Sequence, residues 1–156
     1  MKTKKIITIK NAPDPVGPYS QAILNGNTLY SSGQIAIDPV SNELILENIE
    51  QETHQVMRNI KAILDAAQMN FNDIIKCSIF LSDMNNFERV NSVYASYFSA
   101  QYPVRETVEV SCLPKKVNVE IVSQTRQTFV KNTVRTIAIS DENYNFLTEN
   151  IKVVST

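Results

Sequence analysis

The pattern of apolar and polar residues along the chain predicts strands in six segments. In 102–110 and 117–124 apolar and polar residues alternate, which is typical of a strand with one buried face, and the other segments are short runs rich in apolar or β-branched residues. The segments are 5–9, 22–24, 28–37, 73–83, 102–110 and 117–124. Asn25-Gly26-Asn27, between the second and the third segment, is a strong hairpin signal, because asparagine and glycine accept the backbone of a tight turn.

Two other segments repeat their apolar residues every three or four positions, which is the period of an amphipathic helix. They span 47–69 and 84–101, and Asp83 or Asn85 is available to cap the second. The order β-β-β-α-β-α-β-β predicts an α+β fold, a mixed β-sheet with two helices packed on one face. The other face is then either solvated or covered by another subunit, and Phe80 and Val108 favour a second chain.

An arginine, Arg105, interrupts the pattern of segment 102–110. A guanidinium keeps its proton, and leaving it buried without an anion costs several kcal/mol. The anion is either a carboxylate of the protein or one that arrives with a ligand. Glu120, in segment 117–124, is the protein's candidate, and we expect the two side chains to be near in space. A structural salt bridge between them is the alternative to a ligand site.

Three further polar features could join such a site. Asn91 falls within one turn of apolar residues of the second helix, where a core or capping hydrogen bond also explains it. Tyr19 lies in a Gly-Pro-Tyr-Ser loop, and Ser32-Gly33 ends a strand where the missing side chain permits close backbone approach. Together with Arg105 and Glu120 they would supply an anion clamp, a water-orienting carboxylate, a hydroxyl lid and backbone donors.

Length and charge restrict the class of protein. The 156 residues suit one domain with a substantial core. The net charge of −1 disfavours a dedicated nucleic-acid binder, which usually shows a basic stripe. No apolar run is long enough to span a bilayer and the N-terminus lacks a leader pattern, so we expect no membrane association and a cytoplasmic protein.

The inventory of histidine and cysteine restricts the chemistry. His54 is the single histidine, so a zinc site of the usual type lacks ligands, and its place beside the apolar stripe predicts a surface residue. Cys77 and Cys112 are expected to be reduced. The chemistry is therefore expected to use carboxylate, guanidinium, hydroxyl and backbone groups.

Six motifs follow one another in a specific order: NAPDPVGPYSQAI, YSSGQIAIDP, NIKAILDAA, FLSDMNNFERVNSVYASYF, PVRETVEV and LPKKVNVEI. In this order they resemble the Rid family, the reactive-intermediate deaminases, also called the YjgF or L-PSP endoribonuclease family. The resemblance covers roughly residues 5–122. It is greatest to the RidA branch, because both the arginine of P-x-R and the glutamate after LPKKVNV are present.

The resemblance implies a chorismate-mutase-like α+β fold, a homotrimer, and active sites in the clefts between subunits. It also implies hydrolysis of reactive 2-imino or enamine acids, which pyridoxal-phosphate enzymes such as threonine dehydratase release, to 2-keto acids and ammonia. The partners are therefore small 2-imino or 2-keto carboxylic acids. No cofactor or metal is expected, because an imine is already reactive.

The resemblance also assigns roles to residues. By position, Arg105 matches the family arginine that grips the substrate carboxylate, and Glu120 matches the glutamate that holds the attacking water. Tyr19 is placed with them as a catalytic residue. The positions expected to bind substrate are Ser32, Gly33, Asn91 and Thr107.

The chain departs from the family pattern in three places. Thr107 stands where the family often has a cysteine, on the same face as Arg105, so we expect hydrolysis to survive without thiol-based redox regulation there. Glu106 replaces a small polar residue but points to the opposite face. The family pattern ends before residue 127, which divides the chain into a deaminase domain, 1–126, and a C-terminal extension, 127–156, without an assigned role.

Two other functions compete with imine hydrolysis. An endoribonuclease or translation inhibitor, an activity also attributed to some family members, usually needs cations on the phosphate and an acid–base pair. The near-neutral charge and the single histidine disfavour it. A non-enzymatic metabolite-binding or chaperone-like trimer would instead use Arg105 to dock 2-keto acids without turnover.

Overall fold

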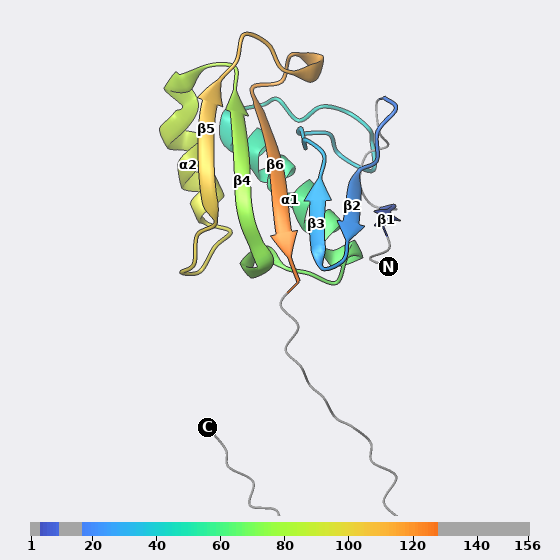
Figure 1. Cartoon of the computed structure of the whole chain (residues 1–156). Helices are drawn as coiled ribbons and strands as arrows, with labels where there is room; N and C mark the ends of the chain where they lie inside the picture. Colours follow the sequence, from blue (N-terminus) through green and yellow to red (C-terminus); the bar gives the residue numbers. More distant parts are fainter. Residues whose placement is uncertain (1–3, 10–16, 128–156) are drawn as a thin grey trace, which may run out of the picture.

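A computed structural model describes residues 4–9 and 17–127, which form a six-stranded sheet with helices on one side (Figure 1). The strands lie side by side in the order β1-β2-β3-β6-β4-β5. Their bounds are Lys4–Ile7 (β1), Ala22–Asn25 (β2), Thr28–Ser31 (β3), Ile74–Leu81 (β4), Val104–Glu109 (β5) and Val119–Arg126 (β6). All neighbours are antiparallel except β4 and β5, so the predicted mixed sheet is confirmed.

The connections follow from local sequence. β2 and β3 form the predicted hairpin, in which Asn25 pairs with Thr28. Gly26 has a φ of 64° there, in the left-handed region that glycine adopts without steric cost. β4 and β5 run parallel, and such strands need a crossover connection, which α2 provides.

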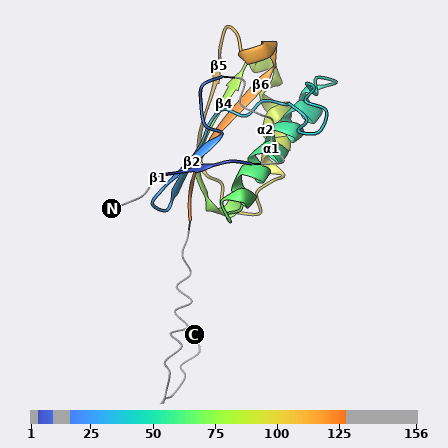
Figure 2. The same cartoon turned by 90° about the vertical axis from the view of Figure 1, so that its right-hand side faces the viewer.

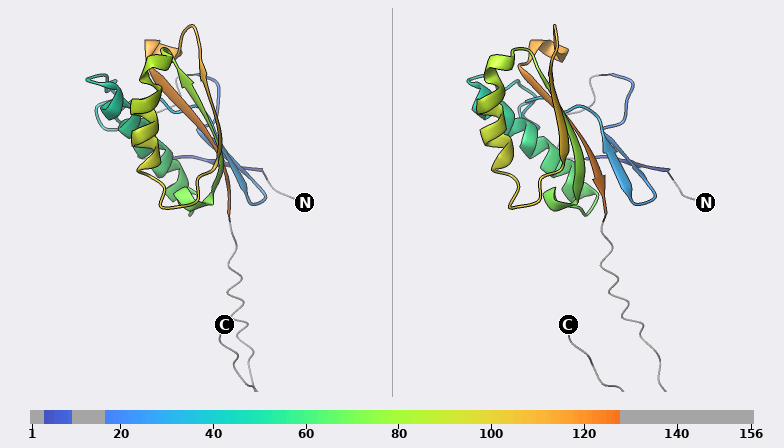
Figure 3. Two further views of the ribbon diagram at one scale, coloured as in Figure 1. Left: turned by 90° about the vertical axis from the view of Figure 1, so that its left-hand side faces the viewer. Right: turned by 60° about the vertical axis from the view of Figure 1, so that its left-hand side comes forward.

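Two α-helices, α1 (Ile49–Ala66) and α2 (Phe87–Ala95), cover one face of the sheet (Figure 3). The side chain of Asn48 caps α1 by accepting a hydrogen bond from the backbone N–H of Gln51. The apolar stripe of α1 packs on the sheet, and burial of this surface stabilises the fold. Apolar side chains with no solvent contact include Val56, Met57, Ile60 and Ile63 of α1, and Leu29, Leu81, Val119 and Ile121 of the strands.

The opposite face of the sheet is not covered by helices of the described chain (Figure 2). Val104 and Val108 lie on it, 69% and 42% exposed, and Tyr30 is 46% exposed. Exposed apolar side chains on an uncovered sheet face suit contact with another chain. The expectation that a second chain covers this face is consistent with these exposures and stays a prediction.

The second helix is shorter than the sequence pattern predicts. Asp83 accepts a hydrogen bond from the N–H of Asn85 and so caps a 3-10 turn, and α2 begins only after this turn, at Phe87. The chain leaves the helix after Ala95, although the apolar spacing continues to Phe98, which still packs into the core.

The strand predicted over 28–37 is also shorter, because β3 ends at Ser31. Beyond it, only Gln34 bridges to the sheet, through Ile121. The α1 side chain of Asn59 binds the carbonyl groups of residues 35 and 37, which are therefore not available to a neighbouring strand.

The described residues agree with the predicted fold class. No described helix is long and apolar enough to cross a membrane. Residues 128–156 lie outside the described residues, so the division at residue 127 stays a prediction.

Candidate active site

Arg105 and Glu120 lie on opposite faces of the sheet. Arg105 pairs in register with Cys77 of β4, whose side chain is buried under the helices. Glu120 pairs with Phe80 of the same strand. Paired residues share a face, and residues 77 and 80 are an odd number of positions apart, so they point to opposite faces. The expected proximity of the two charges within one chain is therefore wrong, and a salt bridge between them is excluded.

The arginine half-site is a cavity of about 390 Å³, lined by Asn91, Tyr94, Ala95, Tyr102, Pro103 and Arg105. Arg105 Nη1 donates a hydrogen bond of 2.7 Å to Oδ1 of Asn91. The guanidinium carbon lies 5.0 Å from the ring centre of Tyr94, a distance typical of a cation–π contact. These partners are neutral, and no carboxylate of the described residues forms an ion pair with Arg105. The α2 side chains thus orient the guanidinium without neutralising it.

The strand after Arg105 alternates as predicted. Thr107 is on the same face, and its hydroxyl oxygen is buried without a hydrogen-bond partner among the described residues. Thr107 does not line the arginine half-site, so its substrate contact stays a prediction. Glu106 points to the opposite face, where it accepts a hydrogen bond from Ser78 and pairs with Lys76 at 3.1 Å.

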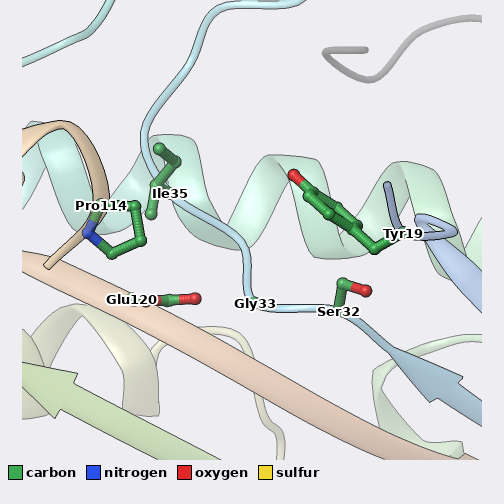
Figure 4. Close-up of a pocket in the computed structure, with 6 residues that line it drawn as sticks. All are labelled: Tyr19, Ser32, Gly33, Ile35, Pro114 and Glu120. Carbon is green, nitrogen blue, oxygen red and sulfur yellow. The ribbon is translucent and has the colours of Figure 1, made fainter. Parts of the chain in front are cut away.

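The glutamate half-site is a second cavity, of about 250 Å³, lined by Tyr19, Ser32, Gly33, Ile35, Pro114 and Glu120 (Figure 4). Partial burial raises the pKa of the Glu120 carboxyl above its ordinary value, because removal from water disfavours the charged form. No described residue donates a hydrogen bond to this carboxylate. A desolvated carboxylate without a partner is suited to take a proton from water.

Gly33 makes room for the Glu120 carboxylate. A Cβ atom on Gly33 would lie 1.7 Å from Oε1 of Glu120, far inside the contact distance of two atoms. The Gly33 backbone is not in the left-handed region, so space rather than strain requires glycine here. The N–H of Gly33 has no acceptor among the described residues and is available as a donor beside the carboxylate.

Ser32 holds the loop that contains Tyr19. Its hydroxyl donates a hydrogen bond of 2.7 Å to the carbonyl of Ser20, and its N–H donates one of 2.9 Å to the carbonyl of Gln21. Tyr19 is 45% exposed and its ring lies near Ser32 at the cavity (Figure 4). The hydroxyl proton of Ser32 is therefore engaged with the backbone, which leaves the hydroxyl oxygen as an acceptor only.

The predicted site residues thus divide between the two half-sites, with Thr107 outside both. Neither cavity is lined by both Arg105 and Glu120. The glutamate half-site has Tyr19, Ser32, Gly33 and Glu120, and the arginine half-site has Asn91 and Arg105.

Sequence analysis missed two buried amides that shape the glutamate half-site. Asn59 of α1 donates through Nδ2 to the carbonyls of Ile35 and Ile37, at 3.0 Å each. Gln55, one turn earlier, donates to Oδ1 of Asn59 at 2.9 Å. These side chains are only 2% and 4% exposed. Two amides at i and i+4 beside an apolar stripe are the signal that would have indicated them.

The remaining candidates for chemistry are accounted for. His54 is partly buried rather than on the surface, because its Nδ1 lies 2.9 Å from the hydroxyl of Tyr97. Cys77 and Cys112 are free thiols, as expected. Within residues 4–9 and 17–127, no three His, Cys, Asp or Glu side chains gather as metal ligands.

A family model described as Endoribonuclease L-PSP matches residues 9–127. This chain belongs to that family, the Rid family. Its relatives include a RutC family protein of Pyrococcus horikoshii, 52% identical over 118 residues that cover 76% of this chain and 94% of the relative. The bovine 2-iminobutanoate/2-iminopropanoate deaminase is 42% identical over 118 residues, 76% and 86% of the two chains.

A solved Rid family structure from Yersinia pestis, described as a protein of unknown function, has the same fold. It is 45% identical and gives a TM-score of 0.78 over 80% of this chain and all of that one. The Rid match includes both half-sites, since all their lining residues lie within residues 9–127. The names of the relatives range from RutC protein to deaminase to endoribonuclease, so membership by itself leaves the reaction to be argued from the site.

Gly33→Ala should displace the Glu120 carboxylate by about 2 Å, because non-bonded carbon atoms pack at about 3.5–4 Å. Gly17→Ala is the matched control, since a Cβ there meets the Tyr19 ring at an ordinary 3.6 Å. Crystal structures of both variants measure the shift. An unmoved Glu120 carboxylate in the Gly33 variant would contradict the assignment of Gly33.

Glu120→Gln should raise the melting temperature at pH 7. Because the folded pKa of Glu120 is raised, the folded chain binds this proton more tightly than the unfolded chain, and stability falls as pH rises from the unfolded to the folded pKa. This gain in melting temperature should vanish below a pH of about 4.3, the pKa of glutamate in the unfolded chain. Glu106→Gln is the control, since hydrogen bonds from Ser78 and Lys76 lower the pKa of Glu106 and no gain is expected. Equal melting temperatures of wild type and the Glu120 variant at pH 7 would refute a desolvated carboxylate.

Proposed function

We propose that the chain hydrolyses 2-imino acids, and the enamine acids that tautomerise to them, to 2-keto acids and ammonia. The observation behind this proposal is an oriented cation that no described residue pairs with an anion, together with a desolvated carboxylate to which no described residue donates a hydrogen bond. Imino-acid hydrolysis needs these two groups, one for the substrate carboxylate and one for the water. The name of the bovine relative supports the same substrate class. We expect this to take place in the cytoplasm.

We propose further that a homotrimer completes the site. The arginine half-site of one subunit meets the glutamate half-site of the next, so the two contacting surfaces differ. A head-to-tail contact between unlike surfaces closes into a ring when its rotation permits, and a ring of three subunits fits the family resemblance. The exposed Val104 and Val108 are a source of apolar contact area for such an interface.

In the complete site, Arg105 binds the substrate carboxylate through two parallel hydrogen bonds, while Asn91 keeps the guanidinium in place. This fixes C2 of the imine next to a water molecule at Glu120 of the partner subunit. The carboxylate takes a proton from the water as the water oxygen bonds to C2. The electron pair of the C=N bond moves to nitrogen, which takes that proton from Glu120. In the resulting carbinolamine the hydroxyl proton passes through Glu120 to nitrogen as the C=O bond forms and the C–N bond breaks, which releases ammonia.

The other residues of the glutamate half-site restrict the water and the substrate. We assign to Tyr19 a hydroxyl lid over the reacting carbon, and to the free N–H of Gly33 a hydrogen bond to the attacking water or the substrate. Both groups lie on the same cavity as Glu120. Neither a metal nor a cofactor has a step in this reaction.

An endoribonuclease is the second candidate, and the description of the family model favours it. Lys115 and Lys116 follow Pro114, which lines the glutamate half-site, and in this proposal they would contact phosphates. Cleavage also requires an acid–base pair, and binding through these lysines would weaken steeply with salt. Salt-dependent RNA cleavage that survives Arg105→Ala would replace the deaminase proposal.

Arg105→Ala should abolish hydrolysis in a coupled assay. When threonine dehydratase releases its imine in the presence of semicarbazide, the wild type should divert the imine and reduce semicarbazone formation. The variant should lower kcat/KM by about 10²-fold or more, because it removes two charge-assisted hydrogen bonds. Arg89→Ala is the matched control: Arg89 is an exposed arginine of α2 that pairs with Glu50. Equal semicarbazone signals from wild type and the Arg105 variant would remove the deaminase proposal.

A further inference from the structure

Glu52 is a fully buried carboxylate that belongs to neither half-site. It lies on the inner side of α1 with 0% of its surface exposed. Its Oε1 accepts hydrogen bonds from the backbone N–H of Asn118, at 2.6 Å, and of Val119, at 3.2 Å. Its Oε2 accepts a third, of 2.9 Å, from the side-chain amide of Asn118. The carboxylate is therefore hydrogen-bonded to the two residues that precede Glu120.

The start of β6 lacks a strand on one side, which explains the need for such an acceptor. On the β4 side, Val119 pairs with Leu81. On the β3 side, the last residue of the described chain to reach β6 is Gln34, which bridges to Ile121. Buried N–H groups are nearly always paired. Glu52 accepts the hydrogen bond from Val119 that a carbonyl of a neighbouring strand would otherwise accept.

The turn before β6 is strained and leads directly into the part that Glu52 grips. Lys115 and Lys116 have φ values of 54° and 58°, in the left-handed region that residues other than glycine rarely adopt. Such conformations persist where the surroundings hold them, often at functional sites. Pro114 before the turn and Glu120 after it both line the glutamate half-site. The stretch that Glu52 contacts therefore lies between two residues that line the cavity.

We propose that Glu52 is a positioning residue for Glu120. By holding residues 118 and 119, it sets how far the strained turn can relax and where the Glu120 carboxylate lies against Gly33. The kinetic consequences rest on the proposed deaminase function. The reach of the Glu52 side chain matters for this role more than its charge, because neutral N–H groups are its partners.

Three substitutions separate reach from charge. Glu52→Gln keeps the length of the side chain and an acceptor oxygen. The new glutamine amide can donate to Oδ1 of Asn118 once the side-chain amide of Asn118 flips. Glu52→Asp keeps the charge but withdraws the acceptor by one methylene. Thr53→Val is the matched control, because Thr53 is equally buried on α1 and donates only to the carbonyl of Ile49 in its own helix.

In the deaminase assay, E52Q should keep kcat within about twofold and E52D should lower it on the order of tenfold or more. KM should stay within about twofold in both variants, because Arg105 still binds the substrate carboxylate. T53V should match the wild type. If the charge of Glu52 were what matters, kcat of E52D would exceed kcat of E52Q. That order would overturn the proposal, and so would an equal loss of kcat in T53V.

A second measurement does not depend on activity. The pKa of Glu120, followed by NMR with ¹³C-labelled glutamate, should fall toward its ordinary value in E52D, because the displaced carboxylate gains water, and should be unchanged in E52Q and T53V. An unchanged pKa in E52D would overturn the positioning role. An inactive wild type would refute the deaminase proposal alone.

If E52D does not fold, Asn118→Ala is the second variant, because it removes one of the three contacts of Glu52. It should give smaller changes in the same direction, and no change would overturn the positioning role.

Discussion

Strand alternation places Arg105 and Glu120 on opposite faces of one sheet, with β4 between the strands that hold them. Side chains on opposite faces cannot meet through the sheet in any rotamer. Each half-site is therefore built by separate elements: α2 orients the cation, and the segment after β3 shapes the space around the carboxylate. Within one chain the two half-sites stay apart, which is why the proposed active site needs a second copy of the chain.

Both half-sites hold a charge that the described chain leaves without a counter-charge. Arg105 contacts the Asn91 amide and two aromatic rings. Glu120 lies against Gly33, and its carboxylate accepts no hydrogen bond from a described residue. Partial desolvation of unpaired charges lowers the stability of the folded state. In the proposed reaction a substrate carboxylate and a bound water supply the missing partners, so the same features that cost stability would favour binding and proton transfer.

Much of this arrangement could be predicted from the sequence, and the part that could not has a physical reason. Period-two alternation correctly put Thr107 on the face of Arg105 and Glu106 on the other, because alternation is a local property. The relation of Arg105 to Glu120 depends on strand order, and β6 lies between β3 and β4 instead of beside β5. Strand order is set by tertiary packing and has no local signal in the sequence.

The buried polar side chains of α1 were missed for a related reason. Glu52 and Asn59 fall at or beside the apolar stripe of the helix, where a polar residue reads as an interruption of the pattern. Their partners are backbone groups of distant segments, at residues 35, 37, 118 and 119, which the helix pattern does not contain. The end of β3 was displaced by contacts of the same long-range kind, whereas α2 begins late because of the local cap at Asp83.

Subunit complementation tests the shared site. Arg105→Ala and Glu120→Ala each remove one half-site, so the separate homo-oligomers should be inactive. After the two variants are unfolded together and reassembled at equal amounts, each interface has about a one-in-four chance of pairing an intact arginine half-site with an intact glutamate half-site. The mixture should therefore recover about a quarter of the wild-type turnover per site. A mixture that contains both variants in the same oligomers and yet stays inactive would contradict a site built from two copies of the chain.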